Sequence, residues 1–309
     1  MEALGRRTFV GRGIELARLG ATLASVRGGT GRAIIVAGEA GIGKSRLLGR
    51  FAEIAAADGA LVLEGACLEA ADGVLPYAPF VEILRELVQS TPPERLPALL
   101  GPGRTELTRL LPELALRAAD VPAATELDRA AQARLFELVL GVFERLAAAR
   151  PLVLAVDELQ WADRSSRELL DFLVRALRDD QALFLLALRT DAQGAPVGNL
   201  AFIAELEREE HVDRLEVGPF GPDETEALVA SLLDGPADPA AVERLLARSD
   251  GNPFYIEELV LAGGGLEGDV PPVLRDVLAA RVAALSGPAH DILRAAAAAG
   301  RRVDDELLA

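Results

Sequence analysis

The segment Gly38–Ser45 constrains this chain more than any other, because its eight residues read GEAGIGKS and match the pattern G-x-x-x-x-G-K-[ST]. A β-branched apolar run at Arg32–Ala37 precedes it and is typical of a buried parallel strand. Apolar residues at helical spacing follow over Ser45–Ala57. A strand, a glycine-rich loop and a helix start in this order predict a phosphate-binding loop; the alternative is an ordinary glycine-rich turn.

Each part of this loop has a physical reason to bind phosphate. Glycines allow successive backbone N–H groups to turn toward one centre, and the N-terminus of the following helix adds partial positive charge. Lys44, the single lysine beside 31 arginines, is expected to reach the β- and γ-phosphates, and the Ser45 hydroxyl is expected to bind Mg²⁺. The residues expected to contact the nucleotide in this stretch are Gly38, Glu39, Ala40, Gly41, Ile42, Gly43, Lys44, Ser45 and Arg46.

Two carboxylates follow a second apolar run. The segment Pro151–Val156 reads PLVLAV and leads directly into Asp157 and Glu158. The carboxyl ends of parallel strands face the ligand crevice of such a sheet. We therefore expect Asp157 to hold Mg²⁺ and Glu158 to accept a proton from an attacking water, the alternative being a solvated acidic loop.

Arg189 follows a third apolar run, LFLLAL at Leu183–Leu188. At that edge of a sheet its guanidinium is placed to sense the γ-phosphate or the attacking water, and the alternative is an arginine that simply caps a strand. Lys44, Glu158 and Arg189 are therefore the predicted catalytic residues.

The apolar runs also predict the fold class. Further strands are expected at Ala60–Glu64 and Val212–Val217, and helical stretches separate the strands. Alternating β and α units of this kind favour an α/β fold of the P-loop NTPase type, a doubly wound parallel sheet with helices on both faces. A glycine-proline boundary at 218–220 precedes a smaller helical region.

Composition excludes several classes of protein. The 48 acidic residues outnumber the 32 basic ones and give a formal net charge of −16, which makes duplex DNA a poor partner for this chain by itself. The single cysteine, Cys67, excludes a disulfide framework and a cysteine-based zinc site, and it fits a reducing cytoplasm. No apolar run approaches the length that crosses a bilayer, so we expect a cytoplasmic protein that does not enter a membrane.

Five segments follow one another along the chain in a recognisable order. They are FVGR at 9–12, GEAGIGKS at 38–45, LPYAPF at 75–80, DELQWAD at 157–163 and GNPFYIEEL at 251–259. Together they resemble the signal-transducing ATPases with numerous domains (STAND), a branch of the AAA-related P-loop proteins. Within that branch the chain is most similar to the large ATP-binding LuxR-type transcription regulators, and similar modules precede adenylate cyclase or kinase domains. The resemblance runs from about Thr8 to the last residue.

The resemblance implies further contacts with the nucleotide, which it identifies as ATP or ADP with Mg²⁺. Val10, Gly11 and Arg12 would lie near the adenine and the ribose, and Pro253 would pack on the adenine. From the residues alone, Arg12 has the alternative of neutralising the start of a helix that carries Glu15. The turn before Pro253 has the alternative of merely separating two helices.

Four regions are expected along the chain. They are an N-terminal arm and helix at 1–31, a nucleotide-binding core at 32–217, a helical lid at 218–264 and the truncated start of a winged-helix domain at 265–309. Members of the family that this chain resembles continue with a helical-repeat sensor and a DNA-reading helix-turn-helix, which are absent from this sequence. We therefore expect the front part of a longer regulator or a naturally shortened one.

The predicted function is a regulatory switch that binds ATP and hydrolyses it slowly. Loss of the γ-phosphate is expected to change the conformation of the chain and thereby of downstream domains, and self-association is expected to depend on the nucleotide. Direct DNA binding by this chain is not expected. The first alternative is a non-hydrolysing scaffold of a cyclase- or kinase-linked signalling protein that keeps ATP or ADP as a structural ligand. A motor-type AAA ATPase is a second alternative, against which the acidic balance argues. A P-loop kinase is a third, against which Asp157 and Glu158 argue.

Overall fold

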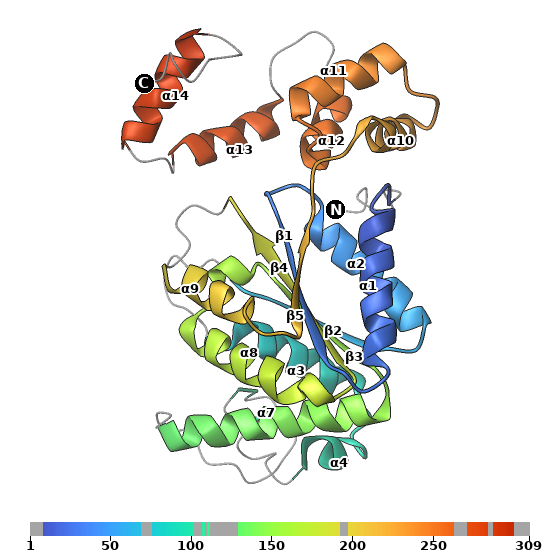
Figure 1. Ribbon diagram of the computed structural model, residues 1–309, viewed down its shortest axis with the longest axis vertical. Coiled ribbons are helices and arrows are strands. Elements are labelled where there is room, and N and C mark those ends of the chain that lie inside the picture. The colour runs from blue at the N-terminus through green and yellow to red at the C-terminus, as the bar shows by residue number, and fades with distance from the viewer. Residues whose placement is uncertain are drawn as a thin grey trace. The chain divides into compact units, whose positions relative to one another are not determined.

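The computed structural model describes residues 9–68, 76–101, 107–108, 110–111, 129–191, 197–262, 271–283 and 287–299. In this part of the chain five strands form one sheet that helices cover (Figure 1). The strands are β1 (Arg32–Gly38), β2 (Leu61–Ala66), β3 (Leu152–Asp157), β4 (Ala182–Arg189) and β5 (Val212–Glu216). The helices up to β5 are α1 (Gly13–Val26), α2 (Lys44–Ala57), α3 (Ala78–Ser90), α4 (Leu96–Leu100), α7 (Arg129–Ala149), α8 (Arg164–Ala176) and α9 (Val197–Leu206), with short 3₁₀ turns η2 (Leu159–Trp161) and η3 (Leu177–Asp179).

All the strands run parallel, in the order β2-β3-β4-β1-β5 across the sheet. The register aligns Gly38 at the end of β1 with Arg189 at the end of β4, and Ala66 of β2 with Asp157 of β3. The C-terminal ends of the strands therefore meet at one edge of the sheet. This edge carries the glycine-rich loop, the two carboxylates and Arg189, as expected for a ligand site of a parallel sheet.

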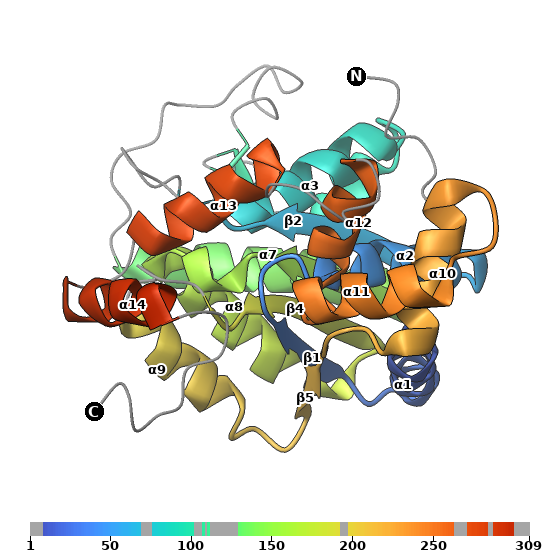
Figure 2. The ribbon, with the colours of Figure 1, turned by 90° about the horizontal axis from the view of Figure 1, so that it is seen from above.

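Helices cover both faces of the sheet, which explains why β1, β3 and β4 do not alternate between apolar and polar residues and have charged residues only at their ends. Helices α1 and α2 lie on one face, and α3, α7, α8 and α9 lie on the other (Figure 2). On the second face Phe80 of α3, Phe143 of α7 and Phe184 of β4 belong to one apolar core and are each at most 2% exposed. This burial on both sides fixes the strand ends that position the site.

The α/β fold with a doubly wound parallel sheet, predicted from the sequence, is confirmed. Each of the five predicted strands is present, and their bounds differ from the expected ones by two residues or fewer. The helix after the glycine-rich loop begins at Lys44, one residue earlier than expected, because the left-handed Gly43 ends the loop there. In the described part of the chain no helix is long and apolar enough to span a bilayer.

The described residues fall into two compact units, and each is considered by itself. The first unit contains residues 11–190 and 197–218 and includes the whole sheet. The second contains residues 9–10, 191 and those from 219 onward. Its helices are α10 (Pro222–Leu233), α11 (Pro239–Ser249), α12 (Pro253–Leu261), α13 (Pro272–Ala283) and α14 (Gly287–Ala299).

The second unit has an apolar core of its own, in which Val229 of α10, Leu245 of α11 and Ile256 of α12 are at most 2% exposed. Gly251 joins α11 to α12 with a φ of +72°, and a Cβ there would lie 2.4 Å from the carbonyl oxygen of Phe220, so only glycine fits. The boundary expected between residues 264 and 265 lies outside the described residues. The four region boundaries and the winged-helix assignment stay predictions.

Candidate functional site

The loop between β1 and α2 has a backbone that only glycine adopts easily. Gly43 has a φ of +101°, and a Cβ added there would meet no atom within 4 Å, so the space beside it is open. Gly38 is closely packed instead, because a Cβ there would lie 2.7 Å from the carbonyl oxygen of Val217. As the residue before α2, Gly43 has no side chain to occupy the N–H groups at the helix start. Those groups and the helix dipole suit an anion such as phosphate.

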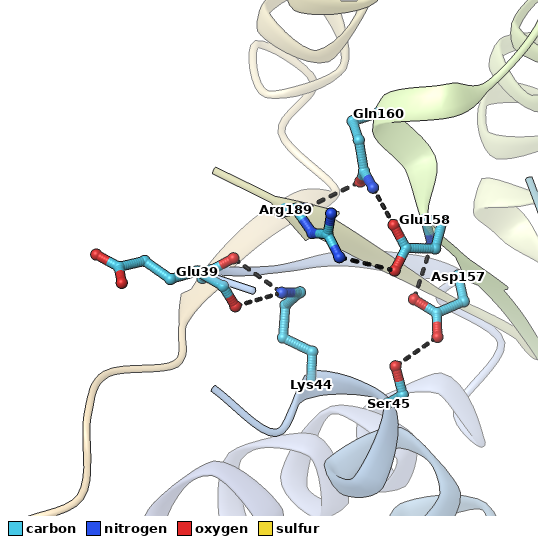
Figure 3. A network of polar contacts seen from close by, with 8 residues as sticks. Glu39, Lys44, Ser45, Asp157, Glu158, Gln160 and Arg189 are labelled. Atoms are coloured by element: carbon cyan, nitrogen blue, oxygen red, sulfur yellow. Dashed lines mark hydrogen bonds and ion pairs between the residues drawn. The ribbon is translucent and has the colours of Figure 1, made fainter. Parts of the chain in front are cut away.

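Lys44 lies over this loop rather than out in solvent. It is 8% exposed, and its Nζ donates hydrogen bonds of 2.8 Å to the carbonyl oxygens of both Gly38 and Glu39 (Figure 3). The Glu39 side chain is exposed and points away from the ammonium group. The loop thus holds the only lysine of the chain at the place where the phosphates of a nucleotide are expected.

Ser45 and Asp157 come together from two elements that lie 112 residues apart in sequence. The Ser45 hydroxyl donates a 2.6 Å hydrogen bond to Asp157 Oδ2, and the Glu158 backbone N–H donates one of 2.7 Å to Asp157 Oδ1. Ser45 is exposed, Asp157 is half-buried, and both residues line a cavity. A hydroxyl and a carboxylate oxygen are ligands that Mg²⁺ accepts, and the pair fits this ion.

Mg²⁺ at this position needs ligands beyond these two. Among the described residues, no group of three histidine, cysteine, aspartate or glutamate side chains is arranged to hold a metal ion. Mg²⁺ commonly completes its octahedral shell with substrate phosphates and waters. The pair of Ser45 and Asp157 therefore suits a metal that arrives with phosphate.

Glu158 stands beside Arg189 at the same edge. Glu158 Oε1 lies 3.9 Å from Arg189 Nη2, and both side chains are about one-third exposed. The carboxylate also accepts a hydrogen bond from Gln160 Nε2 (Figure 3). Glu158 has a φ of +54° and a ψ of +42°, a left-handed conformation that turns the chain sharply after β3. The site thus combines a carboxylate, a guanidinium and an amide within one network.

Arg12 contacts the loop itself. It is 5% exposed, and its Nη2 donates a 2.9 Å hydrogen bond to the carbonyl oxygen of Ile42, while its Nη1 lies 3.1 Å from Glu15 Oε1. Both Gly11 and Arg12 are left-handed, with φ values of +69° and +62°. The ion pair with Glu15 at the start of α1 agrees with the alternative derived from the residues, and the bond to Ile42 was not foreseen.

The remaining predicted nucleotide contacts fall into both units. Ala40 is half-buried, Ile42 is buried and Arg46 is exposed, all in the first unit. Val10 packs against the core of the second unit. Pro253 is the buried first residue of α12, where the Asn252 side chain caps the helix by accepting a 3.1 Å bond from the Phe254 N–H. The adenine contacts of Val10 and Pro253 stay predictions.

A cavity of about 260 Å³ opens beside the proposed metal pair, between α2, β2, β3 and α3. Ser45, Asp157, Glu64 and Glu82 are among the residues that line it. Burial, followed by the charges of Glu86, Asp157 and Glu82, raises the pKa of Glu64 above its ordinary value. The wall of the site beyond Asp157 is therefore acidic and favours cations.

Cys67 follows β2 directly and lies next to Asp157 at the end of β3. Its backbone N–H donates a 3.0 Å bond to the carbonyl oxygen of Asp157, and the residue is 4% exposed. Burial, followed by the charges of Asp163, Asp157 and Glu158, raises the pKa of the thiol to about 12. The thiol is therefore protonated at neutral pH, and the thiolate is the form that acts as a nucleophile.

Sequence reasoning missed two polar residues of the site. Gln160 is 2% exposed and bonds to both Glu158 and the Arg189 backbone, and Asn199 is 1% exposed and donates to the carbonyl oxygen of Gln160. The only signal was the place of Gln160 between two apolar residues just after the carboxylates. Asp163, in the same segment, caps α8 by accepting bonds from the N–H groups of Ser165 and Ser166.

The chain is similar to proteins of several organisms. An uncharacterised protein of Rhizobium meliloti (strain 1021) is 25% identical in an alignment that covers 97% of this chain and 30% of that relative. The chain thus spans about a third of the length of this relative.

Solved structures with a similar arrangement also exist. A STAND protein with a tetratricopeptide repeat sensor from Pyrococcus horikoshii has a TM-score of 0.48 at 19% identity, over 93% of this chain and 34% of that one. The Aeropyrum pernix ORC1 protein in complex with DNA has a TM-score of 0.46 at 15% identity, and the match covers 100% of this chain and 78% of that one. Thermotoga maritima RuvB has a TM-score of 0.43 at 16% identity, and the match covers 97% of this chain and 81% of that one. At such scores these likenesses say nothing about function.

A family model gives the most specific comparison. It describes the AAA ATPase domain and matches residues 8–186, which are more than half of the chain and include the glycine-rich loop, the two carboxylates and β4 up to Leu186. The chain therefore belongs to the AAA ATPase domain family.

Proposed function

We propose that this chain binds ATP with Mg²⁺, hydrolyses it slowly to ADP and phosphate, and works as the regulatory switch module of a LuxR-type transcription regulator in the cytoplasm. The observation that carries the nucleotide part is the 2.6 Å contact between Ser45 Oγ and Asp157 Oδ2. It brings the start of the phosphate-loop helix and the acidic end of β3 to one point, as a shared metal requires. The regulatory part is supported by the five motifs that resemble LuxR-type regulators.

The phosphates are assigned to the loop and the start of α2. The backbone N–H groups of residues 41–45 and the Lys44 ammonium would hold the β- and γ-phosphates. Ser45 and Asp157 would hold Mg²⁺, which when bound neutralises and orients the phosphate oxygens. As the resemblance implies, Val10, Gly11 and Arg12 are proposed to lie near the adenine and ribose, and Pro253 is proposed to pack on the adenine.

The proposed chemistry is water attack on the γ-phosphorus. Glu158 accepts one proton from the water while the new P–O bond forms, and the bond to the β-phosphate oxygen breaks with ADP as the leaving group. Arg189, whose Nη2 is 3.9 Å from Glu158 Oε1, would also sense charge on the γ-phosphate. Loss of that phosphate would change the partners of Lys44 and Arg189 and so favour a second conformation.

Slow turnover is supported by the partners that Lys44 already has. Its Nζ donates hydrogen bonds to two carbonyl oxygens of the loop. Lys44 must exchange at least one of these partners to act on phosphate. Such exchange costs part of the interaction energy that would otherwise lower the barrier.

The test is a phosphate-release assay on the wild-type chain and on Glu158→Gln, with binding of Mg·ATP measured in parallel. We expect the variant to bind ATP within about twofold of wild type and to lose at least about a hundredfold in turnover, since a general base supplies about 10²–10⁴. Glu53→Gln on the outer face of α2 is a matched control, because its carboxylate pairs only with the exposed Arg50 among the described contacts. A wild-type chain that binds ATP but releases no phosphate would favour the non-hydrolysing scaffold.

A further inference from the structure

We propose that Gln160 is a positioning residue that fixes the Glu158 carboxylate and links it to the end of β4. The proposal rests on the proposed hydrolysis, in which Glu158 is the base. Gln160 lies in η2, two residues after Glu158, and is 2% exposed. A buried amide is costly unless its groups are paired, so its contacts define its orientation.

The orientation of the Gln160 amide follows from chemistry. The backbone N–H of Arg189 can only donate, and it lies 3.0 Å from Gln160 Oε1, which therefore accepts. The amide nitrogen must then face the other way, toward Glu158 Oε2, to which it donates. The two ends of one side chain thus join the carboxylate to the backbone of β4 (Figure 3).

The backbone of this turn is held from a third element. Asn199 of α9 is 1% exposed, and its Nδ2 donates to the carbonyl oxygens of Gln160 at 2.7 Å and Ala162 at 3.0 Å. The Trp161 N–H closes the turn by donating a 2.9 Å bond to the carbonyl oxygen of Glu158. Gln160 is therefore fixed at its backbone by α9 and at its amide by β4, and it transmits both restraints to Glu158.

The two carboxylate oxygens of Glu158 have different partners. Oε2 is connected to the Arg189 N–H through Gln160, and Oε1 lies 3.9 Å from Arg189 Nη2. Gln160 is bonded to the Arg189 backbone and not to its guanidinium, so a movement of that side chain toward the γ-phosphate leaves the Gln160 amide in place. Gln160 therefore holds the carboxylate that activates water in one orientation while the guanidinium changes its partners.

Turnover of substituted chains tests this role. Gln160→Met keeps the volume and removes both hydrogen bonds, whereas Gln160→Glu keeps an acceptor for Arg189 and places an oxygen against Glu158. We expect both variants to lose about 10- to 100-fold in kcat with KM for Mg·ATP unchanged within about twofold. Gln132→Met is the matched control, because Gln132 Nε2 also donates to a carboxylate, Glu168 at 2.8 Å, away from the site. An unchanged kcat in a folded Gln160 variant would overturn the proposal.

A double-substitution cycle separates positioning from a general loss of structure. If Gln160 acts only through Glu158, Gln160→Met should change the residual turnover of Glu158→Gln by less than about twofold. The same loss in both backgrounds would indicate a structural effect and overturn the proposal. Thermal unfolding of each variant accompanies the measurement.

A second readout does not depend on turnover. With ¹⁵N in the side chains of the five glutamines, the Gln160 amide signal is assigned from whichever Gln160 variant folds. Replacing the carboxylate acceptor in Glu158→Gln should shift this signal and leave that of Gln132 in place.

If the wild-type chain does not hydrolyse ATP, the proposed hydrolysis is wrong. The amide signal then decides the link itself: a shift supports it, and an unmoved signal overturns it.

Discussion

Replacing Lys44 with alanine should separate nucleotide binding from folding. Lys44 is the only lysine of the chain, and its ammonium is held over the glycine-rich loop by 2.8 Å hydrogen bonds to the carbonyl oxygens of Gly38 and Glu39. Removing the side chain takes away the one flexible point charge that can follow the β- and γ-phosphates. The backbone of the loop depends on Gly43, whose φ of +101° few other residues adopt.

The size of the effect follows from the contacts. A hydrogen bond to a charged group contributes about 1.5–3 kcal/mol, so two phosphate contacts amount to about 3–6 kcal/mol. This corresponds to a rise in Kd for Mg·ATP of about 10²- to 10⁴-fold. Folding should change much less, because the lost hydrogen bonds of an ammonium that is only 8% exposed are offset by its lost desolvation cost. We expect the free energy of unfolding to change by less than about 2 kcal/mol.

Titration calorimetry of Mg·ATP into the wild-type and Lys44→Ala chains measures this difference. Arg50→Ala is the matched control, because it removes one positive charge from the same helix at an exposed position. Its affinity should stay within about threefold of wild type, since the charge is exposed and screened. A folded Lys44→Ala chain that binds Mg·ATP as tightly as wild type would refute the phosphate assignment of the loop.

Three further predictions concern other parts of the chain. Asp157→Asn keeps an acceptor for the Glu158 N–H, so the variant should fold. Wild type should bind ATP more tightly in Mg²⁺ than in EDTA, and the variant should bind it equally in both; a difference as large as that of wild type would argue against a metal at Asp157. Cys67, with a pKa of about 12 instead of 9.0, should react with iodoacetamide at pH 8 about a thousandfold more slowly than an ordinary thiol, and complete alkylation of the folded chain within minutes would contradict its burial. Gly251→Ala should destabilise the second unit by about 1–3 kcal/mol in thermal unfolding, because its Cβ would lie 2.4 Å from the Phe220 carbonyl oxygen at a φ of +72°; an unchanged transition would contradict that packing.

The sheet and the phosphate loop could be predicted because their signals are local. Buried parallel strands read as uninterrupted apolar runs, and each of the five runs became a strand. The meeting of Ser45 and Asp157 followed from topology alone, since both stand at the C-terminal edge of one parallel sheet. These inferences need no knowledge of where a side chain points.

Side-chain partners could not be predicted, because they depend on distances set by the whole fold. Gln160 reaches the Arg189 backbone only because β3 and β4 are neighbours and the left-handed Glu158 turns the chain back toward β4. Arg12 reaches the Ile42 carbonyl because α1 packs on α2, which no pattern near Arg12 indicates. Sequence patterns located the elements, and tertiary packing decided which polar groups met.

A crystal structure of the chain grown with Mg²⁺ and a non-hydrolysable ATP analogue tests the central proposal most directly. It should contain a triphosphate in contact with the N–H groups of residues 41–45 and with Lys44 Nζ. The metal should have Ser45 Oγ and Asp157, directly or through water, among its partners. Density for the analogue elsewhere on the chain would contradict the account. So would a loop in which, at saturating analogue, Lys44 Nζ still bonds to the carbonyl oxygens of Gly38 and Glu39 and contacts no phosphate.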